Sequence, residues 1–146
     1  MQDPSLTTSL VRGGLFTVRS DYQDWIRMAQ DDLLAMERLI PYGYTPYNVV
    51  CYHAQQYAEK IVKAKILELG GDFNYIHDIV VLLADFVKTP QIIQARKYAQ
   101  ILNIYAIRSR YPVDVPFEAD EVLAEEAFRM ATAFPELLNG ARLKNP

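Results

Sequence analysis

The chain has 146 residues, of which 51% are hydrophobic and 23% charged, and its formal net charge is -3. These values are ordinary for one globular domain, and they exclude binding of nucleic acid through overall positive charge, although a local basic patch remains compatible with them. The only cysteine, Cys51, excludes an intramolecular disulfide and indicates a reducing compartment. The sequence shows neither an apolar run of about 18 residues nor a signal peptide, so we expect a cytoplasmic protein without a membrane span.

The first segment, residues 1–19, is rich in Ser, Thr and Gly and shows no helical period. Leu15, Phe16 and Val18 make it too apolar for a simple linker. We therefore predict an N-terminal extension that is either loose or docked on a partner chain. Residues 20–140 are expected to form a single helical domain.

A first long helix is predicted from Ser20 onward. Ser20 and Gln23 form a capping-box pattern, and the helix should end before Pro41, because the residue before a proline is pushed out of the α region. Apolar residues recur on one helical face in between. They are Trp25, Met28, Ala29, Leu33 and Met36.

The second predicted helix is the longest. Thr45 followed by Pro46 is typical of a helix start, with a capping side chain and then a proline at the first helical position. The next helix-breaking signal is the pair Gly70-Gly71, which is typical of a C-terminal stop. Cys51, near the start of this helix, is expected to be a small buried apolar residue.

Three further helices follow. A short, largely apolar helix is predicted over 77–87, and a fourth over 90–109 begins with the same cap-plus-proline signal as the second. The fifth starts at Phe117 or Glu118, and Pro135 must end or kink it. Helices of these lengths with short connections predict an all-α fold, an up-and-down antiparallel bundle of four to five helices.

Several common functional motifs are absent from the sequence. Both glycine pairs lack the Lys-Ser/Thr that would follow them in a phosphate-binding loop. One cysteine and two histidines are too few for a structural zinc site, so we expect no metal and no other cofactor. Cys51 and His53 cannot pair within one helix, because residues two apart point in roughly opposed directions.

A polar stripe on the second helix is the first candidate for a site. His53, Gln56, Lys60 and Lys63 are spaced at i, i+3, i+7 and i+10, and Glu59 precedes Lys63 by four residues, which favours an ion pair. In a central helix of a small bundle, we expect part of this stripe to face a cleft or another chain. A solvated stripe, with His53 bonded to a carbonyl, is an equally acceptable interpretation.

Two further groups of polar residues stand at predicted helix ends. His77 and Asp78 begin the third helix, where a hydrogen bond to the neighbouring turn is the commoner role. Arg108, Arg110 and Tyr111 meet at the C-terminus of the fourth helix, where positive charge is favourable for the helix dipole alone. The two guanidinium groups are equally suited to an anion such as phosphate.

Five segments of the chain together match a known pattern in both order and spacing. They are residues 51–64 (CYHAQQYAEKIVKA), 70–71, 77–83, 102–105 and 108–112. With them, roughly residues 22–134 resemble the HEPN domain (higher eukaryotes and prokaryotes nucleotide-binding). The run His-Ala-Gln-Gln-x-x-Glu-Lys is the most specific part of this resemblance.

The resemblance implies a helical bundle that usually forms a homodimer. In prokaryotes such domains are often encoded beside a minimal nucleotidyltransferase, in several cases as a toxin–antitoxin pair, and nucleotide binding has been proposed for the family. We therefore expect a homodimer, a nucleotidyltransferase partner and a bound nucleotide. The expected ligand-binding residues are His53, Gln56, Lys60, His77, Arg108, Arg110 and Tyr111.

One branch of the family cleaves RNA with an Arg, four to six further residues and then a His. None of the positions five to seven residues before His53 or His77 is Arg, and no histidine follows Arg108. Loss of a general acid or base typically costs about 10²–10⁴ in rate. We therefore expect no catalytic residues and a non-catalytic domain. The alternatives are a ribonuclease toxin with a modified active site and a plain dimeric interaction module.

Overall fold

The computed structural model describes residues 6–11, 14–19, 21–42, 46–110 and 118–145. These residues form six helices and a two-stranded hairpin. In chain order the elements are β1 (Leu6–Val11), β2 (Gly14–Arg19), α1 (Tyr22–Leu39), α2 (Tyr47–Glu68), α3 (Ile79–Leu83), α4 (Pro90–Arg110), α5 (Glu121–Thr132) and α6 (Phe134–Leu137).

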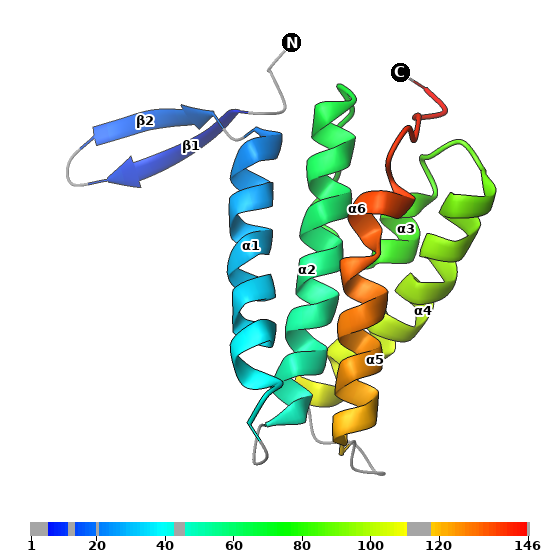
Figure 1. The fold of residues 1–146 in the computed structure, drawn as a ribbon. Coiled ribbons are helices and arrows are strands. Elements are labelled where there is room, and N and C mark those ends of the chain that lie inside the picture. Colours follow the sequence, from blue (N-terminus) through cyan, green and yellow to red (C-terminus); the bar gives the residue numbers. More distant parts are fainter. Residues whose placement is uncertain (1–5, 12–13, 20, 43–45, 111–117, 146) are drawn as a thin grey trace.

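The four long helices form an antiparallel bundle, which confirms the predicted all-α fold. Helices α1 and α4 run in one direction and α2 and α5 in the other (Figure 1). Helix α2 lies in the middle and contacts α1, α4 and α5. The short helices α3 and α6 lie at one end, beside the C-terminal end of α2 (Figure 1). No helix in the described part of the chain combines the length and the apolar character that a membrane span requires.

The N-terminal extension contains a β-hairpin. Strands β1 and β2 pair antiparallel, with Leu6 opposite Arg19 and Val11 opposite Gly14. The hairpin projects sideways from the start of α1 (Figure 1). The sequence predicted an extension that is loose or docked on a partner chain, and the regular pairing of the two strands was not anticipated.

Helix α1 begins one residue later than predicted. Asp21, and not Ser20, is the N-cap: its carboxylate accepts from the backbone N–H groups of Gln23 and Asp24, while Asp24 accepts from the N–H of Asp21. This is a reciprocal capping box in which both side chains are carboxylates, which also suits the positive end of the helix dipole. Ser20 lies outside the described residues.

Helix α2 has the predicted length with a shifted start. Its N-cap is Pro46, which offers no side-chain hydrogen bond, and its first helical residue is Tyr47. The cap predicted at Thr45 lies outside the described residues. The stop is as predicted: Gly70 has a φ of 82°, a left-handed conformation that a residue without a Cβ adopts at little cost.

Helix α3 is much shorter than the predicted range of 77–87. Asp78 is its N-cap, and after Leu83 the chain turns to meet the C-terminal segment. There Phe86 and Leu143 form an antiparallel bridge, and the N–H of Val87 donates to the carbonyl of Arg142. Pairing between segments far apart in the sequence therefore ends this helix.

Helix α5 starts at Glu121, later than predicted, because Asp120 caps the N–H of Leu123. Of the two predicted first residues, Glu118 precedes the helix and Phe117 lies outside the described residues. Pro135 acts as predicted: α5 ends at Thr132, and the proline falls in the first turn of α6.

Small residues fill much of the core between the long helices, together with the larger Met36, Leu102 and Met130. Buried alanines allow the helix backbones to approach closely. They are Ala54 and Ala58 of α2, Ala95 and Ala99 of α4, and Ala124, Ala127 and Ala131 of α5. Phe86 and Phe134 are the bulkiest of the fully buried side chains.

Candidate functional site

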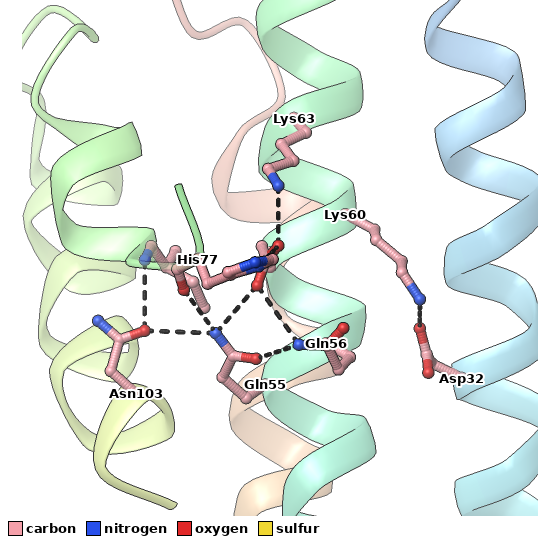
Figure 2. Close-up of polar contacts among 9 residues, drawn as sticks. Asp32, Gln55, Gln56, Lys60, Lys63, His77 and Asn103 are labelled. Atoms are coloured by element: carbon pink, nitrogen blue, oxygen red, sulfur yellow. Dashed lines mark hydrogen bonds and ion pairs between the residues drawn. The ribbon is translucent and has the colours of Figure 1, made fainter. Parts of the chain in front are cut away.

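The polar residues of α2 divide between two sides of the helix. His53 and Lys60 are seven residues apart, almost two full turns, so they share one line along the helix. His53 Nδ1 lies 2.8 Å from Asp32 Oδ1 of α1, and Lys60 Nζ lies 2.6 Å from Asp32 Oδ2. The Asp32 side chain is 8% exposed. These three residues, the Asp32 cluster, join α1 to α2 (Figure 2 shows the Lys60 contact).

The second group faces α3 and α4 (Figure 2). It consists of Glu59 and the residues around its carboxylate, and we call it the Glu59 cluster: Gln55, Gln56, Glu59, Lys63 and His77. Glu59 Oε1 accepts from Lys63 Nζ at 2.8 Å and lies 3.1 Å from His77 Nδ1. Glu59 Oε2 accepts from the side-chain amides of Gln55 and Gln56 at 3.3 and 3.4 Å. The predicted Glu59–Lys63 ion pair is confirmed, and it is almost wholly buried.

Aromatic rings complete the surroundings of Lys63. Its Nζ lies 5.1 Å from the centroid of the Trp25 ring and 5.3 Å from that of Phe73. The faces of aromatic rings are negative, so both rings favour the ammonium group. The buried cation is therefore held by one carboxylate and two rings from α1 and the loop after α2.

Asn103 of α4 connects the Glu59 cluster to α3. Its side-chain Nδ2 donates to Asp78 Oδ1 at 2.8 Å, and its Oδ1 accepts from the backbone N–H of Ile79 at 3.3 Å. Gln55 donates to the backbone carbonyl of His77 at 3.0 Å. Asp78 Oδ1 also caps α3 through the N–H groups of Val80 and Val81. The start of α3 is thus fixed by side chains of α2 and α4.

A hollow of about 300 Å³ opens between α2, the start of α3 and α4; we call it the α2–α4 pocket. The volume is at the lower end of the range for small-molecule sites. Its lining residues are Tyr52, Gln55, Gln56, His77, Asp78, Asn103, Ala106 and Ile107. The lining therefore combines amide, carboxylate and imidazole groups with the ring of Tyr52 and the aliphatic side chains of Ala106 and Ile107.

The structure does not bring the seven expected ligand-binding residues together. Gln56 and His77 line the α2–α4 pocket, whereas His53 and Lys60 face α1. Arg108 is exposed on α4, and the backbone of Arg110 ends that helix. Tyr111 lies outside the described residues.

Sequence reasoning missed Tyr52, Gln55 and Asn103 as lining residues and gave Asp78 no ligand role. A helical projection could have found two of them, because Tyr52, Gln55 and Glu59 recur at i, i+3 and i+7 and so share a face. Asn103 belongs to a different helix. No spacing signal relates it to α2, although it lies in one of the segments that resemble the HEPN domain.

Comparison with known proteins identifies the family. The family model of the HEPN domain matches residues 22–141. The chain belongs to the HEPN domain family. The match begins at the first residue of α1 and extends past α6, so the HEPN domain here is the whole helical bundle.

Two solved structures resemble this HEPN domain. TT1696 from Thermus thermophilus is 28% identical with a TM-score of 0.70, and the match covers 82% of this chain and 96% of that one. ST0689, described as an archaeal HEPN homologue, is 29% identical with a TM-score of 0.65, covering 83% and 97%. Since almost all of each relative is matched, the similarity involves the entire bundle. No curated protein matches the chain.

Proposed function

We propose that this HEPN domain is a non-catalytic protein that binds a nucleotide in the α2–α4 pocket. The observation that carries the proposal is the convergence of Gln56, His77 and Asn103, from three separate parts of the chain, on one hollow. All three lie in segments on which the resemblance to the HEPN domain rests. An aromatic ring, Tyr52, and aliphatic side chains offer an apolar wall for a base, and the polar groups offer orientation.

The lack of catalysis rests on the residues that could serve as acid or base. The sequence contains no Arg at the spacing that the ribonuclease branch requires before either histidine. His77 Nδ1 lies 3.1 Å from Oε1 of the buried Glu59 carboxylate, and no arginine is among the described residues that line the pocket. The described lining therefore offers hydrogen bonds and shape and contains no arginine–histidine pair of the kind that the cleaving branch uses.

Isothermal titration of the full chain with nucleoside monophosphates and triphosphates tests nucleotide binding. We expect saturable binding, together with a rise in melting temperature, because a ligand of the native state must stabilise it. His77→Ala should weaken binding about 3- to 10-fold, the effect of one lost hydrogen bond. The control is Tyr75→Ala, an 85% exposed residue of the same loop that does not line the pocket. Absence of binding by every nucleotide would refute the proposal.

The proposed protein partner is a minimal nucleotidyltransferase, in a pair of toxin–antitoxin type, and this part rests on family membership alone. Its test is co-expression with the product of an adjacent gene, where that gene encodes such an enzyme. We expect the two to co-purify at a fixed ratio, and failure of an adjacent nucleotidyltransferase to bind would refute the pairing.

A homodimer is also proposed, and the outer face of α4 supports it. Four isoleucines of this helix are exposed, which is unusual for a surface in contact with water alone. They are Ile93, Ile101, Ile104 and Ile107. Burial of this face against a second copy would remove their apolar surface from water.

A further inference from the structure

Few charged groups line the α2–α4 pocket. Asp78 contributes a carboxylate, and the described lining contains no Lys or Arg. The nearby Lys63 is buried, and its charge is balanced by Glu59. A phosphate group at this pocket would therefore meet a like charge, and His77 is the one described lining residue that can become positive. How the pocket receives an anion thus depends on the state of this ring.

The His77 ring is held from one side by α2 (Figure 2). Its Nδ1 lies 3.1 Å from Oε1 of Glu59, and Gln55 donates to its backbone carbonyl. A carboxylate can only accept hydrogen bonds, and Glu59 pairs with the Lys63 ammonium as a carboxylate, so Nδ1 must carry a proton. The remaining polar atom of the side chain is Nε2, to which no described residue bonds. The side chain is 78% exposed, so Nε2 is left for a ligand.

Protonation reverses what Nε2 of His77 offers. In the neutral ring, with the proton on Nδ1, Nε2 carries a lone pair, which accepts hydrogen bonds and repels a phosphate oxygen. In the protonated ring, Nε2–H becomes a donor, and its hydrogen bond to a phosphate is assisted by opposite charges. Histidine is the side chain whose charge ordinarily changes between about pH 5 and 8. The fixed tautomer therefore makes the ring a poor phosphate ligand when neutral and a good one when protonated.

The other charged groups near this ring come from two parts of the described chain. Helix α2 contributes Glu59, which is paired with Lys63, and the residue before α3 contributes Asp78. The lining residues of α4 are uncharged. The other histidine of the chain, His53, faces α1 and does not line the pocket. Among the lining residues, His77 is therefore the one expected to gain a positive charge as the pH falls.

We propose that His77 is the phosphate-binding residue of the α2–α4 pocket and acts in its protonated form, so that nucleotide affinity falls as the ring loses its proton. This rests on the proposed nucleotide binding and specifies how the same site is regulated, because a rise in pH releases the ligand. The positive ring offsets the charge of Asp78, and its Nε2–H donates to a phosphate oxygen.

Titration calorimetry of the full chain and of His77→Gln, at pH 6 and at pH 8, tests this proposal. The ligand is the nucleoside monophosphate that binds the native chain most tightly. Glutamine can still donate to Glu59 but cannot become charged. The native chain should bind about 10-fold or more tightly than the variant at pH 6, where a hydrogen bond to a charged group is lost, and within about 3-fold of it at pH 8. Because both proteins meet the same ligand, titration of the phosphate itself cancels from the ratio.

His53→Gln is the matched control, because it removes the other histidine of the chain, which lies outside the pocket. It should keep the pH dependence of the native chain. The parent nucleoside, which lacks the phosphate, should bind both proteins in the same ratio at the two pH values or not bind at all. Melting temperatures report whether each variant is folded, and His77→Asn is a second variant without a titrating ring.

The outcomes separate this proposal from the proposed function. If a nucleotide binds but the folded His77→Gln variant weakens it equally at both pH values, or at neither, the phosphate role of His77 is overturned and nucleotide binding stands. The same conclusion follows if the nucleoside shows the pH-dependent difference, or if the folded His53→Gln variant abolishes it. If no nucleotide binds at either pH, both proposals are overturned.

Discussion

Lys63 carries a buried charge that needs a compensating partner. Its side chain is 3% exposed, and that of its partner Glu59 is 4% exposed. Two desolvated charges of this kind depend on each other, because removal of one leaves the other buried without compensation. The Glu59 cluster must therefore stay complete for the helices around it to remain packed.

Replacing Lys63 by Met should destabilise the fold strongly. The variant retains most of the side-chain volume but leaves the Glu59 carboxylate without its cation, so the free energy of unfolding should fall by about 3–5 kcal/mol. The matched control is Lys65→Met, which removes an ion pair to the more exposed Glu68 and should cost no more than about 1 kcal/mol. Urea denaturation measures both, and equal losses would contradict this account.

Cys51 is buried, as predicted, and burial raises the pKa of its thiol from an ordinary 9.0 to about 11, with a smaller contribution from the charge of Asp120. The thiol should therefore resist modification by a disulfide reagent at pH 8 in the folded protein and react once urea unfolds it. Rapid reaction of the folded protein at the rate of the unfolded chain would contradict the prediction.

The same shift has a consequence for stability at alkaline pH. The folded state holds the thiol proton more tightly than the unfolded state, so this contribution is complete below about pH 9 and is lost as pH rises through about 11. Burial also raises the pKa values of Tyr57 and Tyr105, which adds loss of the same sign. In Cys51→Ala the fall of melting temperature between pH 9 and 11 should be shallower than in the native chain.

At the scale of elements, the end of α2 depends on the backbone of Gly70. A Cβ built there would meet nothing within 4 Å, so any cost of substitution arises from its φ of 82° alone. Gly70→Ala should therefore lower the free energy of unfolding by about 1–2 kcal/mol. Gly70→Asn should cost less, because asparagine tolerates the left-handed region. Chemical denaturation distinguishes them, and equal costs would contradict a purely conformational origin.

Local signals explain how much of the fold the sequence could predict. Pro46, Pro135 and Gly70 end or begin helices through their own backbone properties, so their effects were visible in the sequence. The end of α3 was not, because it is set by the pairing of Phe86 with Leu143. Capping was predicted one residue from its true place at α1, since neighbouring Ser and Asp are both good caps.

In the candidate site, likewise, a contact within one helix was predictable from the sequence, whereas contacts between helices were not. The Glu59–Lys63 pair follows from a spacing of four within one helix and was predicted. Contacts between helices were not: Asp32 binds His53 and Lys60 from α1, and Asn103 binds Asp78 from α4. A sequence indicates which residues share a face of one helix, but the partner helix that this face meets depends on the packing of the whole bundle.

At the scale of the whole molecule, the exposed isoleucines of α4 predict a dimer. Ile104 is 52% exposed, and a charge at this position should weaken self-association at least about 10-fold, because an unpaired charge would be buried in the contact. Sedimentation analysis of Ile104→Asp against the native chain measures this. Val122→Asp, on α5 at a position 71% exposed, is the control. A monomeric native chain, or equal effects of both changes, would contradict the proposed dimer.

The central position of α2 also determines how the bundle can come apart. Its buried residues contact α1 on one side and α4 and α5 on the others. Part of α2 therefore stays covered unless all three of these helices separate from it. Its backbone hydrogens can therefore reach solvent only when the entire core opens, whereas the five-residue α3 can open alone. The slowest exchanging amides of the protein should then belong to α2, and their rate would report the global stability on which the pocket along that helix depends.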